Sequence, residues 1–90
     1  MFYTYILKSE LNKKYYIGQT NNLKGRLNKH NKGGSKWTKP FRPWELAHYE
    51  EYNTRSEAIK RENYLKSLKD KPLIDKIISQ GGGVANRIRL

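Results

Sequence analysis

The chain has 90 residues, the length of one domain, and 36% of them are apolar, which is enough for one small core. Nineteen Lys and Arg residues stand against eight Asp and Glu, so the formal net charge is +11. Solubility alone requires a charge of about 2 to 8 in a small domain, so the excess indicates a polyanionic partner. Nucleic acid is the first candidate partner, and an anionic membrane surface is the second.

Cysteine is absent from the chain, which excludes disulfides, thiolate metal sites and a cysteine nucleophile, and fits a reducing compartment. The apolar opening Phe2–Leu7 stops at Lys8, so we expect neither a signal peptide nor a membrane span. Eleven aromatic residues argue against disorder. The composition therefore predicts a folded cytoplasmic protein that does not enter a membrane.

Two segments near the start of the chain predict a β-hairpin. Residues 2–8 and 14–20 are rich in aromatic and β-branched side chains, and the polar stretch 9–13 has the length of a hairpin turn. Gly18 interrupts the second strand near its end, which permits a bulge or the close approach of another backbone. A third strand is expected over residues 44–52.

The first helix is expected directly after the hairpin. Residues 20–22 supply capping side chains, apolar residues then recur at helical spacing, and two glycines at 33–34 end the helix. Arg26 lies beside the apolar stripe of this helix and not opposite it. Residues 36–43 form a basic loop, whose two prolines predict an absence of regular structure.

Two further helices are expected in the second half of the chain. The first begins near residue 54, with Thr54 or Ser56 as its cap, and carries apolar residues as far as Leu68. The second is short, begins after Asp70 with a proline in its first turn, and ends at the glycines 81–83.

The predicted fold class is therefore α+β, in the order ββα-β-αα. A small antiparallel three-stranded sheet is expected, with the helices packed on it. Residues 1–80 form the domain in this prediction, and residues 81–90 form a glycine-rich basic tail.

Glu62 is the most informative position on the second predicted helix. It lies within the arc that Ala58 and Leu65 share, on the apolar face. A carboxylate on such a face costs several kcal/mol unless a partner compensates its charge. The partner is either a basic side chain such as Arg26 or Arg55, a divalent cation or a hydrogen-bond network.

Other polar side chains allow two interpretations. Arg26 either extends to water or grips a phosphate through two parallel hydrogen bonds. His30, one turn further on, is either a surface or half-buried histidine or a catalytic group. The hairpin tyrosines, Tyr5 and Tyr16 among them, either pack in the sheet or carry protons. Residue type alone leaves these choices open.

Four elements occur in order along the chain. The hairpin holds Tyr3-Thr4-Tyr5 and then Tyr16-Ile17-Gly18, and residues 26–30 read R-x-x-x-H. Residues 61–66 form a helix segment with a central Glu. Together these elements resemble the GIY-YIG nuclease family, whose two tripeptides lie on adjacent strands. Residues 34–39 resemble its small stand-alone members in particular.

The resemblance implies a one-metal hydrolase of phosphodiester bonds, an endonuclease acting on DNA in repair or recombination. Tyr5 and Tyr16 would be the active-site tyrosines, one of which helps to deprotonate the attacking water. Arg26 would bind the scissile phosphate, and His30 would assist proton transfer or substrate contact. Glu62 would hold Mg²⁺ or Mn²⁺, which need few protein ligands when a substrate phosphate is present.

A nucleic-acid-binding surface is also expected along the approach to this site. Its five basic side chains are Lys29, Lys32, Lys36, Lys39 and Arg42. In the same loop, Trp37 or Phe41 either stacks on an unpaired base or anchors the loop. The alternative function is a non-catalytic nucleic-acid-binding module that retains the fold, and such a module has no need of an inward carboxylate at Glu62.

Overall fold

The computed structural model describes residues 1–68 and 70–80. Its elements follow the predicted order ββα-β-αα, with a 3₁₀-helix, η1, before the third strand. The strands are β1 (Phe2–Ser9), β2 (Tyr15–Thr20) and β3 (Trp44–Tyr52). The helices are α1 (Leu23–Asn31), η1 (Lys39–Phe41), α2 (Arg55–Leu68) and α3 (Lys71–Gln80). The α+β prediction is confirmed, and the predicted tail, 81–90, lies outside the described residues.

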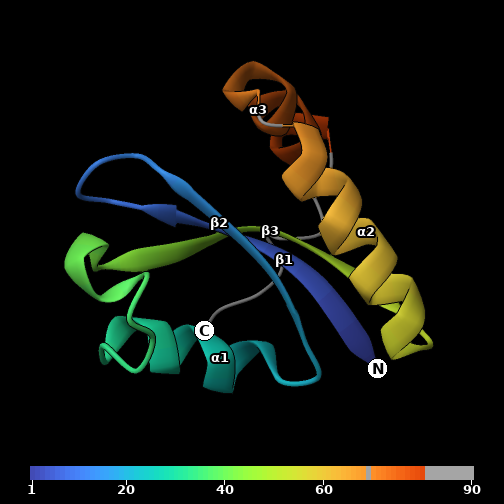
Figure 1. Cartoon of the computed structure of the whole chain (residues 1–90), viewed down its shortest axis with the longest axis horizontal. Coiled ribbons are helices and arrows are strands. Elements are labelled where there is room, and N and C mark those ends of the chain that lie inside the picture. Colours follow the sequence, from blue (N-terminus) through green and yellow to red (C-terminus); the bar gives the residue numbers. More distant parts are fainter. Residues whose placement is uncertain (69, 81–90) are drawn as a thin grey trace.

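The three strands form one antiparallel sheet in the order β2-β1-β3, so β1 is central. Figure 1 shows α1 on one side of the sheet and α2 with α3 on the other. The middle of β1, residues 4–7, is buried on both faces because helices cover both sides. The Thr4 hydroxyl donates a 2.7 Å hydrogen bond to the Ala58 carbonyl and so fastens β1 to α2.

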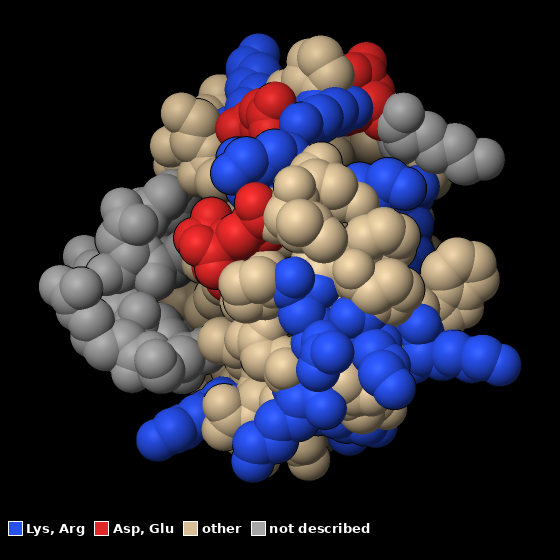
Figure 2. All heavy atoms as spheres, turned by 90° about the vertical axis from the view of Figure 1, so that its left-hand side faces the viewer, with Lys and Arg blue, Asp and Glu red and all other residues tan. Residues whose placement is uncertain are grey.

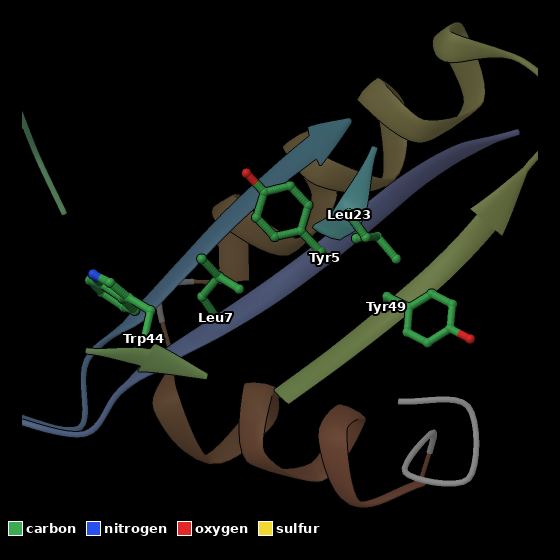
Figure 3. Packing of buried hydrophobic residues seen from close by; sticks show 5 residues of the cluster. All are labelled: Tyr5, Leu7, Leu23, Trp44 and Tyr49. Carbon is green, nitrogen blue, oxygen red and sulfur yellow. The ribbon is translucent and has the colours of Figure 1, made fainter. Parts of the chain in front are cut away.

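Two apolar clusters hold the layers together. The cluster on the α1 side gathers side chains from β1, α1 and β3 on one face of the sheet (Figure 3): Tyr5, Leu7, Leu23, Trp44 and Tyr49. The cluster on the α2 side joins β1 to α2 and α3 through Ile6, Leu65 and Ile74. Each such side chain stabilises the fold by roughly 1.5–3 kcal/mol through burial. Because successive side chains of β1 point to opposite faces of the sheet, this strand contributes residues to both clusters.

The predicted helix ends are largely found where the capping residues stand. The Asn22 side chain accepts a 3.0 Å bond from the Gly25 amide at the start of α1. Beyond the end of α1, Gly33 adopts a φ of 80°, the left-handed conformation that glycine tolerates. Of the two proposed caps of α2, Thr54 is the one used, because its hydroxyl accepts a bond from the Glu57 amide.

The loop prediction is wrong for residues 39–41. They form η1, with Pro40 in its first turn. Proline fixes φ near −65° and lacks an amide that a first turn would leave unpaired, so it suits the start of a short helix. The segment 36–43 is therefore more ordered than its proline content indicates.

Candidate active site

Tyr5, Tyr16 and His30 come together from β1, β2 and α1. The Tyr5 hydroxyl lies 3.3 Å from His30 Nε2. The Tyr16 ring centre lies 4.7 Å from that of His30 and 6.3 Å from that of Tyr5. Tyr5 crosses the edge strand above Gly18, its partner in the sheet register. The sequence predicted a bulge or the close approach of another backbone at Gly18, and the group that approaches it is instead the Tyr5 side chain.

The hydrogen bonds around His30 fit one of its two neutral tautomers. The Thr38 hydroxyl donates to the Ser35 carbonyl at 3.4 Å, and its oxygen lies 2.8 Å from His30 Nδ1. This geometry fits the tautomer in which Nδ1 donates to the Thr38 hydroxyl oxygen, while the Thr38 hydroxyl proton is directed to the Ser35 carbonyl. Nε2 is then unprotonated and accepts the Tyr5 hydroxyl proton. In this arrangement the unprotonated Nε2 of His30 faces the buried hydroxyl of Tyr5.

His30 is almost completely buried, against the expectation of a surface histidine that the sequence left open. Burial lowers the pKa of His30 from 6.5 to about 4, and the positive charges of Arg26 and Lys29 act in the same direction. The imidazole is therefore neutral at physiological pH. A neutral ring can take up a proton during a reaction, whereas an imidazolium cannot.

Burial also raises the pKa of the Tyr5 hydroxyl well above its usual value. The nearby Tyr16 adds to this rise, and so does the negative charge of Glu62. The positive charge of the Arg26 guanidinium acts in the opposite direction. The Tyr5 hydroxyl is therefore protonated and neutral at physiological pH. The charges of Arg26 and Glu62 both act on its pKa.

Glu62 has a partner that the sequence interpretation did not name. Its half-buried carboxylate accepts a 2.6 Å hydrogen bond from Lys66 Nζ, one helical turn further along α2. Neither suggested arginine fills this role in the described residues, since Arg55 instead donates to Gln19 and lies over the Phe2 ring. The i,i+4 spacing of Glu62 and Lys66 in the sequence is typical of such an ion pair and could have predicted it.

The small number of protein ligands near Glu62 restricts which metal ion could bind there. Among residues 1–68 and 70–80, no three His, Cys, Asp or Glu side chains gather into a metal-binding group. Mg²⁺ commonly binds through one or two carboxylates, with waters and substrate phosphates as the other ligands. Glu62 fits that pattern as a single protein ligand, provided that Lys66 gives up its bond.

Three of the five predicted nucleic-acid contacts line one basic hollow. Lys36, Lys39 and Arg42 surround a depression of about 640 Å³ together with Asn31. The other two, Lys29 and Lys32, belong to the end of α1 and are exposed. Figure 2 shows Lys and Arg side chains gathered over the lower half of one face, at the height of α1 and the loop after it in Figure 1. This face offers phosphate groups a positive surface.

Sequence reasoning did not single out two other groups. Thr38, which orients His30, was overlooked because a threonine in a basic loop carries no signal by itself. On β3, Glu50 bonds His48, Tyr52 and Arg61, and these bonds lower its pKa to about 2 although burial opposes the shift. This second network lies on β3 and α2 and fastens the helix to the sheet.

The fold and the arrangement of these side chains define a nuclease domain family. The family model described as the GIY-YIG catalytic domain matches residues 1–75. The chain belongs to the GIY-YIG family, which confirms the family predicted from the motifs. Among the described residues, no helix has the length and apolarity needed to cross a bilayer.

The relatives of this chain include proteins of the UPF0213 group. The chain is 42% identical over 69 residues to a UPF0213 protein of Clostridium perfringens, covering 76% of this chain and 73% of that one. It is 39% identical over 80 residues to one of Staphylococcus saprophyticus, covering 88% and 95%. The solution NMR structure of a UPF0213 protein from Bacillus halodurans is similar to the whole chain, with a TM-score of 0.57 at 28% identity and 97% of that chain covered.

Proposed function

We propose that this chain is a divalent-metal-dependent endonuclease that hydrolyses phosphodiester bonds in DNA. The observation that carries the proposal is the contact of Tyr5, Tyr16 and His30, which come from three separate elements. The charges of Arg26 and Glu62 both act on the pKa of the Tyr5 hydroxyl, which supports their assignment to the same site. A module that only binds nucleic acid needs the Tyr5 ring for packing, but does not need its hydroxyl within hydrogen-bond distance of a neutral His30.

In this proposal Arg26 binds the scissile phosphate. It lies one turn before His30 on α1 and is half-buried, so its guanidinium is partly shielded from water. A guanidinium in such a place makes paired hydrogen bonds to phosphate and stabilises the charge that develops as the bond breaks. Glu62 would hold the cation, which when bound supplies further positive charge to the phosphate oxygens.

Tyr5 and His30 provide a path for the proton of the attacking water. As the water loses a proton to the Tyr5 oxygen, the Tyr5 hydroxyl proton passes to His30 Nε2, which already faces it. Thr38 keeps His30 in the tautomer that makes this transfer feasible. The raised pKa of Tyr5 means that it acts as a relay and does not stand as a phenolate in the free protein.

Substrate binding would itself prepare His30 for this task. Burial is the main reason why the His30 pKa is about 4, and Arg26 and Lys29 lower it further because two positive charges disfavour a third. A phosphate placed against these cations offsets their charge and raises the His30 pKa towards the working pH. The acceptor thus becomes stronger when the substrate is in place.

The alternative remains a nucleic-acid-binding module without catalysis. The observation that favours it is the Glu62–Lys66 bond, which satisfies the carboxylate without a cation. Under this alternative Glu62 has a structural partner, and the protein binds DNA equally with and without Mg²⁺.

The test is a cleavage assay on labelled linear, nicked, flapped and branched DNA, with Mg²⁺, with Mn²⁺ and with a chelator. Cleavage that needs the metal and is lost in Arg26→Ala supports the proposal. Lys24→Ala is the matched control, because it removes one exposed charge from the same helix. Binding to every substrate without cleavage under any metal condition would instead establish the binding module.

A further inference from the structure

An aromatic hollow opens directly beside Tyr16. It has a volume of about 530 Å³, and Tyr16, Phe41 and Trp44 contribute to its lining. Tyr16 links it to the candidate active site, since the ring of this residue also contacts His30. Thr38 lines the hollow as well as orienting His30. A ligand in this space would therefore lie next to the proposed site of cleavage.

Trp37 also lines this hollow, and 83% of its surface is exposed. The sequence left open whether Trp37 or Phe41 anchors the loop, and the structure separates the two. Phe41 is half-buried against the core cluster, and Trp44 is fully buried with its indole N–H bonded to the Thr38 carbonyl. Those two residues anchor the segment, so Trp37 is not needed for that purpose.

The backbone next to Trp37 is nevertheless held firmly. Its neighbour Thr38 is buried and bonds His30, Ser35 and Trp44. The exposed indole of Trp37 is therefore attached to a firmly held stretch of backbone at the edge of an apolar depression. An exposed aromatic ring held in this way loses little conformational entropy on binding a flat ligand.

The charge of the lining indicates an anionic ligand. Lys14 and Lys66 both line the hollow, and no acidic residue does so among the residues that the structure describes. Lys14 Nζ lies 5.0 Å from the centre of the Phe41 ring, at the boundary between the aromatic and the basic groups. Stacking surfaces flanked by lysines are the combination that single-stranded nucleic acid requires.

We propose that this hollow binds an unpaired nucleobase of a DNA strand adjacent to the phosphate that is cleaved. Trp37 stacks on the base, and Lys14 contacts the neighbouring phosphate; Lys66, whose Nζ is bonded to Glu62, joins it when that carboxylate holds a cation. The proposal rests on the proposed function for the position of the cleaved bond, and it names the substrate class: DNA with an unpaired segment, such as a flap, gap or frayed end. The exposed Trp37 ring supplies a stacking surface and the indole N–H of Trp44 is already bonded, so we expect the site to be tolerant of base sequence.

The experiment measures binding without metal, so it does not depend on cleavage. Oligo-dT is titrated against the protein, with intrinsic tryptophan fluorescence and the anisotropy of a labelled strand as readouts. Wild-type fluorescence is expected to be quenched by oligo-dT and much less by a blunt duplex. Trp37→Ala should weaken oligo-dT binding about tenfold or more and duplex binding less than about twofold. Trp37→Phe, which retains a stacking surface, should recover most of the affinity.

Tyr64→Ala is the matched control, because Tyr64 is an exposed aromatic residue on α2 that packs against Arg61 and does not line the hollow. It should leave oligo-dT binding unchanged. An absence of quenching, or an equal loss of duplex and oligo-dT binding in Trp37→Ala, would overturn the base site. If Trp37→Ala selectively loses oligo-dT binding while the wild type cleaves no substrate, the base site stands and the nuclease proposal fails.

Discussion

The Tyr5 ring lies so close above Gly18 that no side chain fits at residue 18. A Cβ atom on Gly18 would stand 2.6 Å from the Tyr5 hydroxyl oxygen and 2.8 Å from the ring carbon that bears it. Tyr5 and Gly18 are partners in the β1–β2 register, so this contact is set by the pairing of the strands. The glycine is therefore what allows Tyr5 to cross the edge strand and reach His30.

Gly18→Ala is expected to destabilise the fold by about 1–3 kcal/mol, because both residues are buried and the ring must shift. Urea unfolding would measure this loss. Tyr5→Phe removes the closest atom, so the double variant should lose less stability than the sum of the two single variants. Fully additive losses would mean that the methyl group introduced by Gly18→Ala meets something other than the Tyr5 hydroxyl.

Local sequence patterns were sufficient to predict most of the fold. Strand positions follow from aromatic and β-branched runs, and the ends of α1 from Asn22 and Gly33, since these signals act over a few residues. The presence of η1 was not predicted, because proline excludes a helix interior but not a first turn. Interactions between residues close in sequence therefore account for the strands and helices, including η1.

The candidate site was predictable only in part, because its contacts join distant segments. The motif resemblance named Tyr5 and His30, but their hydrogen bond joins residues 25 positions apart and depends on how α1 packs against the sheet. The role of Thr38 depends on the same packing. Lys66 is different, since its contact with Glu62 is local and its spacing in the sequence already indicated it.

Arg26→Ala is expected to lower the cleavage rate far more than it lowers DNA affinity. The proposed contact strengthens as charge develops on the phosphate, and loss of one such donor typically costs about 10²–10³ in rate. Single-turnover kinetics together with binding isotherms separate the two effects. Equal losses in rate and affinity would make Arg26 a general phosphate contact.

Folding stability should fall as the pH drops from about 6.5 to about 4 through the titration of His30. The unfolded chain binds a proton at His30 below pH 6.5, whereas the folded chain does so only near its pKa of about 4. Protons therefore favour the unfolded state in this window, and the loss levels off below it. Urea midpoints between about pH 8 and 4 measure the slope, which should flatten in His30→Gln. An unchanged slope in that variant would show that His30 is not held neutral by the fold.

DNA binding should depend steeply on salt, with a log–log slope of about −4 to −5 if four to six phosphates are contacted. The double variant Lys36→Gln/Lys39→Gln, in the basic hollow, should reduce that slope by roughly 2. Lys60→Gln/Lys76→Gln changes the net charge equally from exposed positions on α2 and α3 and should change the slope little. A slope near zero in the wild type would contradict any nucleic-acid function.

Glu62→Gln tests the proposed metal ligand against a structural role. The amide keeps the shape of the side chain and removes its charge, so a cation bound by one carboxylate loses its protein ligand. The Lys66 partner is more than half exposed, and pairs of this i,i+4 kind contribute only about 0.3–0.5 kcal/mol. The variant should therefore fold, and should bind DNA at least as well as the wild type because a negative charge is gone. It should lose Mg²⁺-dependent cleavage.

Lys66→Gln is the matched control, since it breaks the same ion pair and leaves the carboxylate in place. Because Lys66 no longer competes for Glu62, this variant should reach half-maximal cleavage at a lower Mg²⁺ concentration than the wild type, at saturating DNA. Glu62→Gln should show no cleavage at any Mg²⁺ concentration, and thermal melts of both variants should stay close to that of the wild type. Two results would each refute Glu62 as the metal ligand: cleavage by Glu62→Gln at the wild-type rate, or a large loss of stability in both variants that accounts for their inactivity.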